Sequence, residues 1–124
     1  MVRAIFNPNG GPIRVDITAG YAQPGSYALL LWGANTNAVV GEWRGNFINN
    51  DDDYYFLPTP LEKNNGRIID CIATFTLLPP IKQFLLKVEV LQDGNILATD
   101  VREGESEEQT VSVEIFIALA SNGE

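Results

Sequence analysis

Residues 84–95 read FLLKVEVLQDGN, and this stretch predicts the fold class of the chain. Large apolar side chains recur at every second position from Phe84 to Val90, which is the period of a strand with one buried face. Asp93 and Gly94 follow, and this dipeptide favours a two-residue hairpin turn because both turn positions adopt positive φ. The stretch therefore predicts two antiparallel strands joined by a tight turn.

The turn also predicts how the two strands pair. An uninterrupted ladder running back from the turn joins Gln92 with Asn95, Leu91 with Ile96, Val90 with Leu97, Val88 with Thr99, Lys87 with Asp100 and Leu86 with Val101. In this register apolar residues face one another and Lys87 faces an opposite charge, both of which stabilise cross-strand pairs.

The period of two continues along the rest of the chain. Residues 13–17 and 110–119 alternate clearly, and residues 2–6, 39–47 and 54–57 are also strand-like, whereas the one helical candidate, residues 61–65, is short. Eight or nine short strands separated by turns are typical of a sandwich. We therefore predict an all-β, two-sheet antiparallel β-sandwich, immunoglobulin-like or jelly-roll-like, forming one domain over residues 1–120 with a flexible tail at 121–124.

Charge and hydropathy limit the partners. Sixteen acidic residues against eight basic ones give the chain a formal net charge of −8. Such a surface repels nucleic-acid phosphates and anionic membranes, so we expect neither as a partner. The sequence contains no signal peptide and no apolar stretch long enough to span a bilayer, which predicts a cytoplasmic protein or one exported without a signal peptide.

The residue types present exclude most catalytic machinery. The chain has no histidine, so it can form no Ser-His-Asp triad, no Cys-His dyad and no His-ligated metal site. Its single cysteine, Cys71, lies in an apolar run, and we expect it to be a small buried hydrophobe. A hydrolase that uses two carboxylates is the remaining enzyme class, but sixteen acids make some pair inevitable. We predict that the protein is not an enzyme.

Two acidic runs lie between predicted strands. Residues 49–53 read NNDDD, and Asp51, Asp52 and Asp53 could bind Ca²⁺, because a hard cation relieves the repulsion between neighbouring carboxylates. The alternative is a solvated turn, in which Asn and Asp are common for conformational reasons. Residues 103–108 contain the second run, which we predict to be a solvated surface loop. We expect no other cofactor.

Aromatic residues gather beside the first acidic run. Trp43, Tyr54 and Tyr55 lie near Asn49, and an exposed ring beside amide and carboxylate groups is typical of a sugar-binding platform or of a protein interface. Consecutive strand residues point to opposite faces, so Tyr54 and Tyr55 cannot both face one core. The alternative is a tyrosine that covers a sheet face with its hydroxyl in water.

Two segments are apolar on both faces, residues 27–32 and 68–78. A sandwich has one interior, so one row from each segment faces away from it unless a bulge or twist turns both rows inward. Because monomers rarely expose large apolar patches, we expect a homo-oligomer. The predicted function is a non-enzymatic binding or assembly module that acts through protein contacts and self-associates. The alternative is a carbohydrate-binding module, Ca²⁺-dependent, that uses Asp51–Asp53 and the neighbouring aromatic residues.

Overall fold

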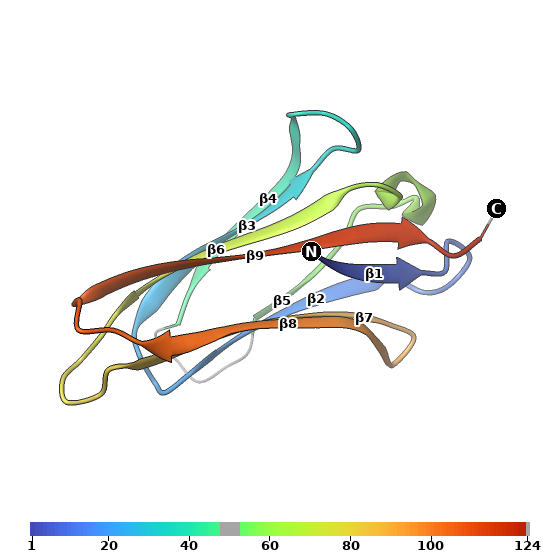
Figure 1. Cartoon of the computed structure of the whole chain (residues 1–124). Coiled ribbons are helices and arrows are strands. Elements are labelled where there is room, and N and C mark those ends of the chain that lie inside the picture. Colours follow the sequence, from blue (N-terminus) through green and yellow to red (C-terminus); the bar gives the residue numbers. More distant parts are fainter. Residues whose placement is uncertain (48–52, 124) are drawn as a thin grey trace.

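The computed structural model describes residues 1–47 and 53–123, which form two β-sheets packed face to face (Figure 1). This confirms the predicted two-sheet sandwich. The described elements are β1 (Val2–Phe6), β2 (Ile13–Gly20), β3 (Gly25–Trp32), β4 (Val39–Asn46), β5 (Asp53–Phe56), the 3₁₀ turn η1 (Leu61–Asn64), β6 (Ile68–Thr76), β7 (Gln83–Gln92), β8 (Asn95–Glu105) and β9 (Thr110–Ser121). Within the described ranges, no helix is long and apolar enough to cross a membrane.

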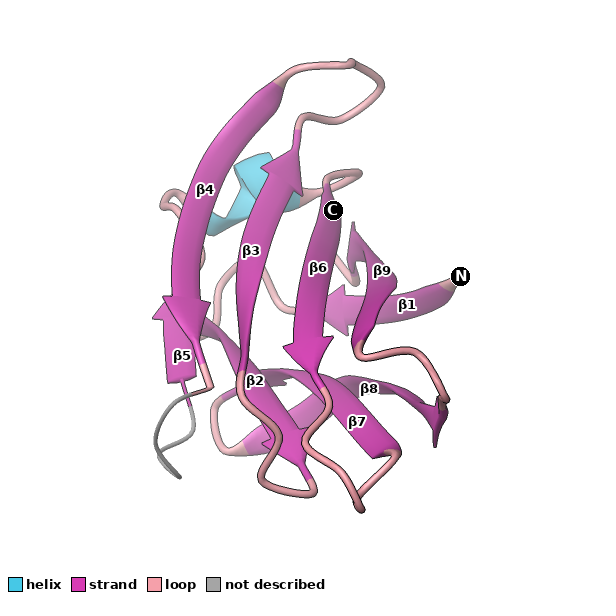
Figure 2. Ribbon diagram, turned by 90° about the vertical axis from the view of Figure 1, so that its left-hand side faces the viewer, coloured by secondary structure: helices cyan, strands magenta, loops and turns pink. Residues whose placement is uncertain are grey.

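The five-stranded sheet has the order β1-β9-β6-β3-β4, and the four-stranded sheet has the order β5-β2-β7-β8. Figure 2 shows β4, β3, β6 and β9 side by side in the first of these sheets. The two segments that are apolar on both faces, β3 and β6, are central strands in it. Neighbouring described strands are antiparallel except β1 and β9, which run parallel and place Val2 opposite Ile117.

The core lies between the two sheets and is built by the alternation seen in the sequence. Fully buried side chains come from both sheets, including Ile13, Val15, Ile17, Leu29, Leu31, Ile69, Phe75, Leu86, Val88, Val90, Ile115 and Ile117. Cys71 is also fully buried, and burial raises the pKa of its thiol to about 12. This confirms the prediction that Cys71 is a small buried hydrophobe.

The Asp93-Gly94 turn forms as predicted, but the predicted register holds for only two pairs. Both turn residues have positive φ, 52° and 78°, and Leu91 pairs with Ile96. Beyond that pair the ladder shifts, because β8 contains one extra residue at Leu97. From there every predicted pair is wrong by one position: Val90 faces Ala98, Val88 faces Asp100, Lys87 faces Val101 and Leu86 faces Arg102.

The predicted register fails because β8 contains a β-bulge within Ile96, Leu97 and Ala98, which are all apolar. The bulge leaves Ile96 outside, 60% exposed, while it turns Ala98 into the core. Asp100 consequently forms its ion pair with Arg102 on its own strand, at 3.0 Å, and not with the Lys87 of the neighbouring strand.

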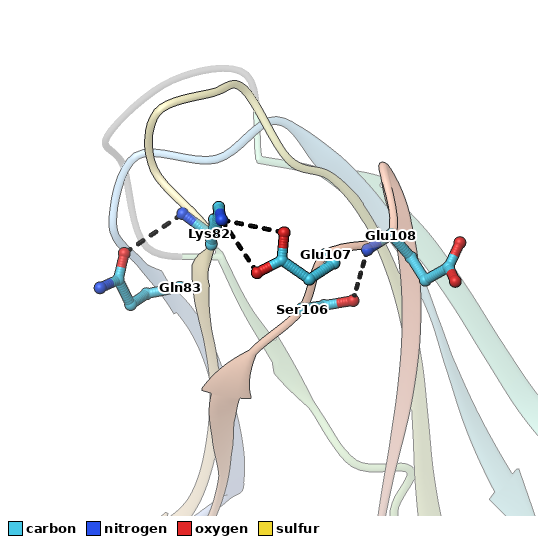
Figure 3. A network of polar contacts seen from close by, with 5 residues as sticks. All are labelled: Lys82, Gln83, Ser106, Glu107 and Glu108. Atoms are coloured by element: carbon cyan, nitrogen blue, oxygen red, sulfur yellow. Dashed lines mark hydrogen bonds and ion pairs between the residues drawn. The ribbon is translucent and has the colours of Figure 1, made fainter.

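The second acidic run is shorter as a loop than predicted, because β8 continues to Glu105. Figure 3 shows how the remainder is held. The Lys82 ammonium group contacts both carboxylate oxygens of Glu107 at 2.9 Å, and this carboxylate raises the pKa of Lys82. The backbone N–H of Ser106 donates to the Lys82 carbonyl, while the Ser106 hydroxyl accepts the N–H of Glu108. The loop is therefore tied to the connection between β6 and β7.

Candidate functional site

The outer face of the five-stranded sheet carries the outward side chains of the two segments that are apolar on both faces. Strand alternation sends Leu29 and Leu31 into the core, so Leu30 and Trp32 point outward. The pairing of β3 with β6 is regular from Gly25 to Trp32, so no bulge turns both rows inward there. We call the following outward residues the apolar face: Ile5, Ala28, Leu30, Trp32, Ile68, Ile72, Phe116 and Ala118.

The register makes this face continuous across three strands that are distant in the sequence. Asp70 on β6 lies directly between Phe116 on β9 and Leu30 on β3. In the next row Ile68 lies between Ala118 and Trp32. The face is therefore a connected cluster in the middle of the sheet, with one carboxylate inside it.

The apolar face is also hollowed. The connection between β3 and β4 projects beyond the rest of the sheet (Figures 1 and 2). Its residues Asn35 and Asn37 form one side of a hollow of about 680 Å³, which Trp32, Ile68 and Phe116 also line. A second hollow of about 400 Å³ is lined in part by Leu30, Ile72 and Arg44. Both volumes suit an inserted side chain or a small group.

Asp70 differs from the other buried polar residues. In the described ranges these are Gln23, Asn64, Asp70 and Gln92, and the three amides each hydrogen-bond loop backbone. Gln23, for example, accepts the N–H of Leu78 and donates to two carbonyl groups. The amides thus satisfy groups that loops would otherwise leave unpaired. Asp70 lies instead on a strand, beneath the apolar face, and is only 3% exposed.

One oxygen of Asp70 accepts a hydrogen bond, and the other has no donor among the described residues. The Trp32 indole N–H donates to Asp70 Oδ2 at 3.0 Å. The buried Oδ1 receives no hydrogen bond from a donor in the described part of the chain. Glu114 lies diagonally across from Asp70, and its hydrogen bond to Asp70, together with burial, raises the pKa of Glu114 to about 7. Because a carboxylate cannot donate, this contact forms only when one of the two carboxyl groups is protonated.

Charged residues surround the apolar face at its two sides. Arg3 projects outward from β1, and Glu42 and Arg44 project outward from β4. The Arg44 guanidinium contacts Glu42 at 2.7 Å, so these two charges are satisfied by one another.

The three aromatic residues predicted to bind a ligand do not share one surface. Trp43 and Tyr55 are both half-buried between the sheets, with ring centroids 5.8 Å apart. Tyr54 points the other way, as expected for the next residue of a strand, and is 57% exposed. Its ring lies 5.9 Å from the Phe56 ring and 5.2 Å from the Arg14 guanidinium. Carbohydrate binding through this group stays a prediction.

Asp53 is the one predicted metal ligand that the structure describes. Its carboxylate accepts the hydroxyl of Tyr27, whose pKa is raised by burial and by this hydrogen bond. Gly45 leaves room for the Tyr27 ring to reach Asp53, because a Cβ at position 45 would overlap that ring. Among residues 1–47 and 53–123, no three His, Cys, Asp or Glu side chains are grouped to hold a metal ion. Asn49, Asp51 and Asp52 lie outside the described residues, so calcium binding stays a prediction.

No family model, curated protein or solved structure matches this chain. The candidate site residues that sequence reasoning missed are Asp70 and Glu114. The available signal was a lone carboxylate inside the apolar run 68–78, where a charged residue is costly unless it has a partner.

Proposed function

We propose that this protein is a non-enzymatic assembly module that binds a second copy of itself through the apolar face of the five-stranded sheet. The observation that supports this most is the continuous cluster of outward apolar side chains across β9, β6 and β3. Phe116 and Ile72 in this cluster are 38% and 36% exposed. A monomer rarely exposes a contiguous apolar patch of more than a few hundred Å².

Charge favours a second copy as the partner. The whole chain carries −8, so most orientations of two copies repel one another. The strands of the apolar face hold two arginines, Arg3 and Arg44, against three carboxylates, Glu42, Asp70 and Glu114. This face is therefore close to neutral, and a two-fold axis would bring the same patch together on both copies.

Light scattering coupled to size-exclusion chromatography tests the proposal. At micromolar concentration and mildly acidic pH, the wild-type protein should have a mass above that of one chain, because burial of apolar surface drives association. Ile72→Lys should reduce this mass to that of one chain, since a lysine cannot be buried unpaired in the interface.

Val101→Lys is the matched control. Val101 is also 36% exposed, but it lies on the outer face of the four-stranded sheet. This variant should keep the wild-type mass. A one-chain mass for the wild type at every concentration, or equal masses for the two variants, would contradict self-association through the apolar face.

A further inference from the structure

We propose that Asp70 and Glu114 hold one proton between them on the apolar face, and that this proton controls the association of two copies. The first half of this inference stands on the geometry of the single chain. The second half rests on the proposed function.

The need for a proton follows from the burial of Asp70. Its side chain is 3% exposed and is covered by the surrounding apolar residues, so water does not reach Oδ1. The Trp32 N–H occupies Oδ2 only. A buried acceptor without a donor is costly, and more so when it is charged. Within the described ranges, the neighbour that can supply a donor is the protonated carboxyl group of Glu114.

The proton belongs on Glu114. The carboxyl group with the raised pKa is that of Glu114, whereas Asp70 Oδ2 already accepts the Trp32 indole N–H. Glu114 is exposed at the surface of the isolated chain, so its carboxyl group can exchange the proton with solvent.

The charged groups facing this pair do not remove the need for the proton. Towards β1 lies Arg3, and towards β4 lie Glu42 and Arg44, which pair with each other. β3 contributes the indole N–H of Trp32 and no charged group to this face. Attraction to a cation is not among the causes acting on the pKa of Glu114, which are the hydrogen bond to Asp70, burial and repulsion by Asp70.

The pair links protonation to association. At high pH it carries two negative charges, and closing the face would bury both in each copy. When Glu114 is protonated the pair carries one charge, and the strands of the face become formally neutral. Closing the face buries Glu114 further, which raises its pKa again, so association takes up protons and is favoured as pH falls.

The experiment compares sedimentation velocity of three proteins at about pH 5.5 and about pH 8.5, on either side of the raised pKa of Glu114. The wild-type dimer should be at least about tenfold weaker at the higher pH, which corresponds to about half a unit of further pKa rise for each of the two Glu114 carboxyl groups on association. Glu114→Gln should remain associated at both values, since its amide donates to Asp70 at every pH. Glu103→Gln, a neutralisation on the outer face of the other sheet, should behave like the wild type.

A carbon-13 NMR titration of the Glu114 carboxyl group separates the two halves of the inference. A midpoint near pH 7, falling towards the usual range in Asp70→Asn, supports the shared proton even if every sample has the mass of one chain, in which case self-association fails. A Glu114 that titrates in the ordinary range in the wild type overturns the shared proton. If the wild type and Glu114→Gln associate with the same pH dependence, the proton does not control association.

Discussion

The two outer faces of the sandwich are both built by strand alternation, but they differ in how their charged side chains are paired and buried. The outer face of the four-stranded sheet pairs its charges within strands, with Arg14 contacting Asp16 at 2.7 Å and Lys87 contacting Glu89 at 3.5 Å. The outer face of the five-stranded sheet buries Asp70 among apolar side chains with one oxygen unsatisfied. Both faces expose apolar side chains, among them Tyr54 and Ile96 on the first and Ile72 and Phe116 on the second. Of the described residues, only Asp70 on the second face is a buried carboxylate with an oxygen that has neither a hydrogen-bond donor nor an ion-pair partner.

The largest expected difference between the faces comes from removing one aromatic ring from each. Trp32→Ala should lower the free energy of unfolding by about 2–4 kcal/mol, because it removes half-buried apolar surface and the donor to Asp70. Tyr54→Ala should cost less than about 1 kcal/mol, since Tyr54 is mostly exposed. Urea unfolding at about pH 6 measures both. Equal losses would mean that the two rings are equally important to the fold.

Neutralising one aspartate on each face should give effects of opposite sign. At about pH 8, where Glu114 is ionised, Asp70→Asn should raise the free energy of unfolding by about 1–2 kcal/mol. The amide removes a buried charge, still accepts from Trp32 and can donate to Glu114. Asp16→Asn should lower it by up to about 1 kcal/mol, because it weakens the ion pair with Arg14. Destabilisation by both changes would show that Asp70 is satisfied by a group other than Glu114.

The smallest expected effect is the response to salt. Arg14→Gln should cost less than about 1 kcal/mol at low ionic strength, because it removes a partly exposed ion pair and the contact with the Tyr54 ring. This cost should largely vanish in about 1 M NaCl, where charges are screened within about 3 Å. The cost of Leu30→Ala on the apolar face should not fall with salt. The measurement is thermal unfolding of the two variants and the wild type across a salt series.

Much of the fold could be predicted because alternation is a local property. Residues 13–17, 84–92 and 111–119 each show which side chains face the core, and the apolar segments 27–32 and 68–78 indicate central strands. The register of β7 and β8 could not be predicted in full, because Ile96, Leu97 and Ala98 are all apolar. Any one of them can face inward, so the position of the bulge depends on packing against the rest of the core.

The candidate site was harder to predict, because it depends on contacts between distant strands. Asp70 and Glu114 meet only through the pairing of β6 with β9, which no local pattern specifies. Nearness in the sequence also misleads for the aromatic residues. Trp43 packs towards the core, while Trp32 faces outward and donates its indole N–H to the Asp70 carboxylate.

The parallel pairing of β1 with β9 has a consequence for synthesis on the ribosome. Phe6 is fully buried, and its strand, β1, pairs with β9, which is the last strand in the described part of the chain. Val2 therefore leaves the exit tunnel 115 residues before its partner Ile117, a delay on the order of ten seconds at typical translation rates. Throughout that interval β1 has no β9 to pair with, so the five-stranded sheet can gain its first strand only after its last strand has been translated.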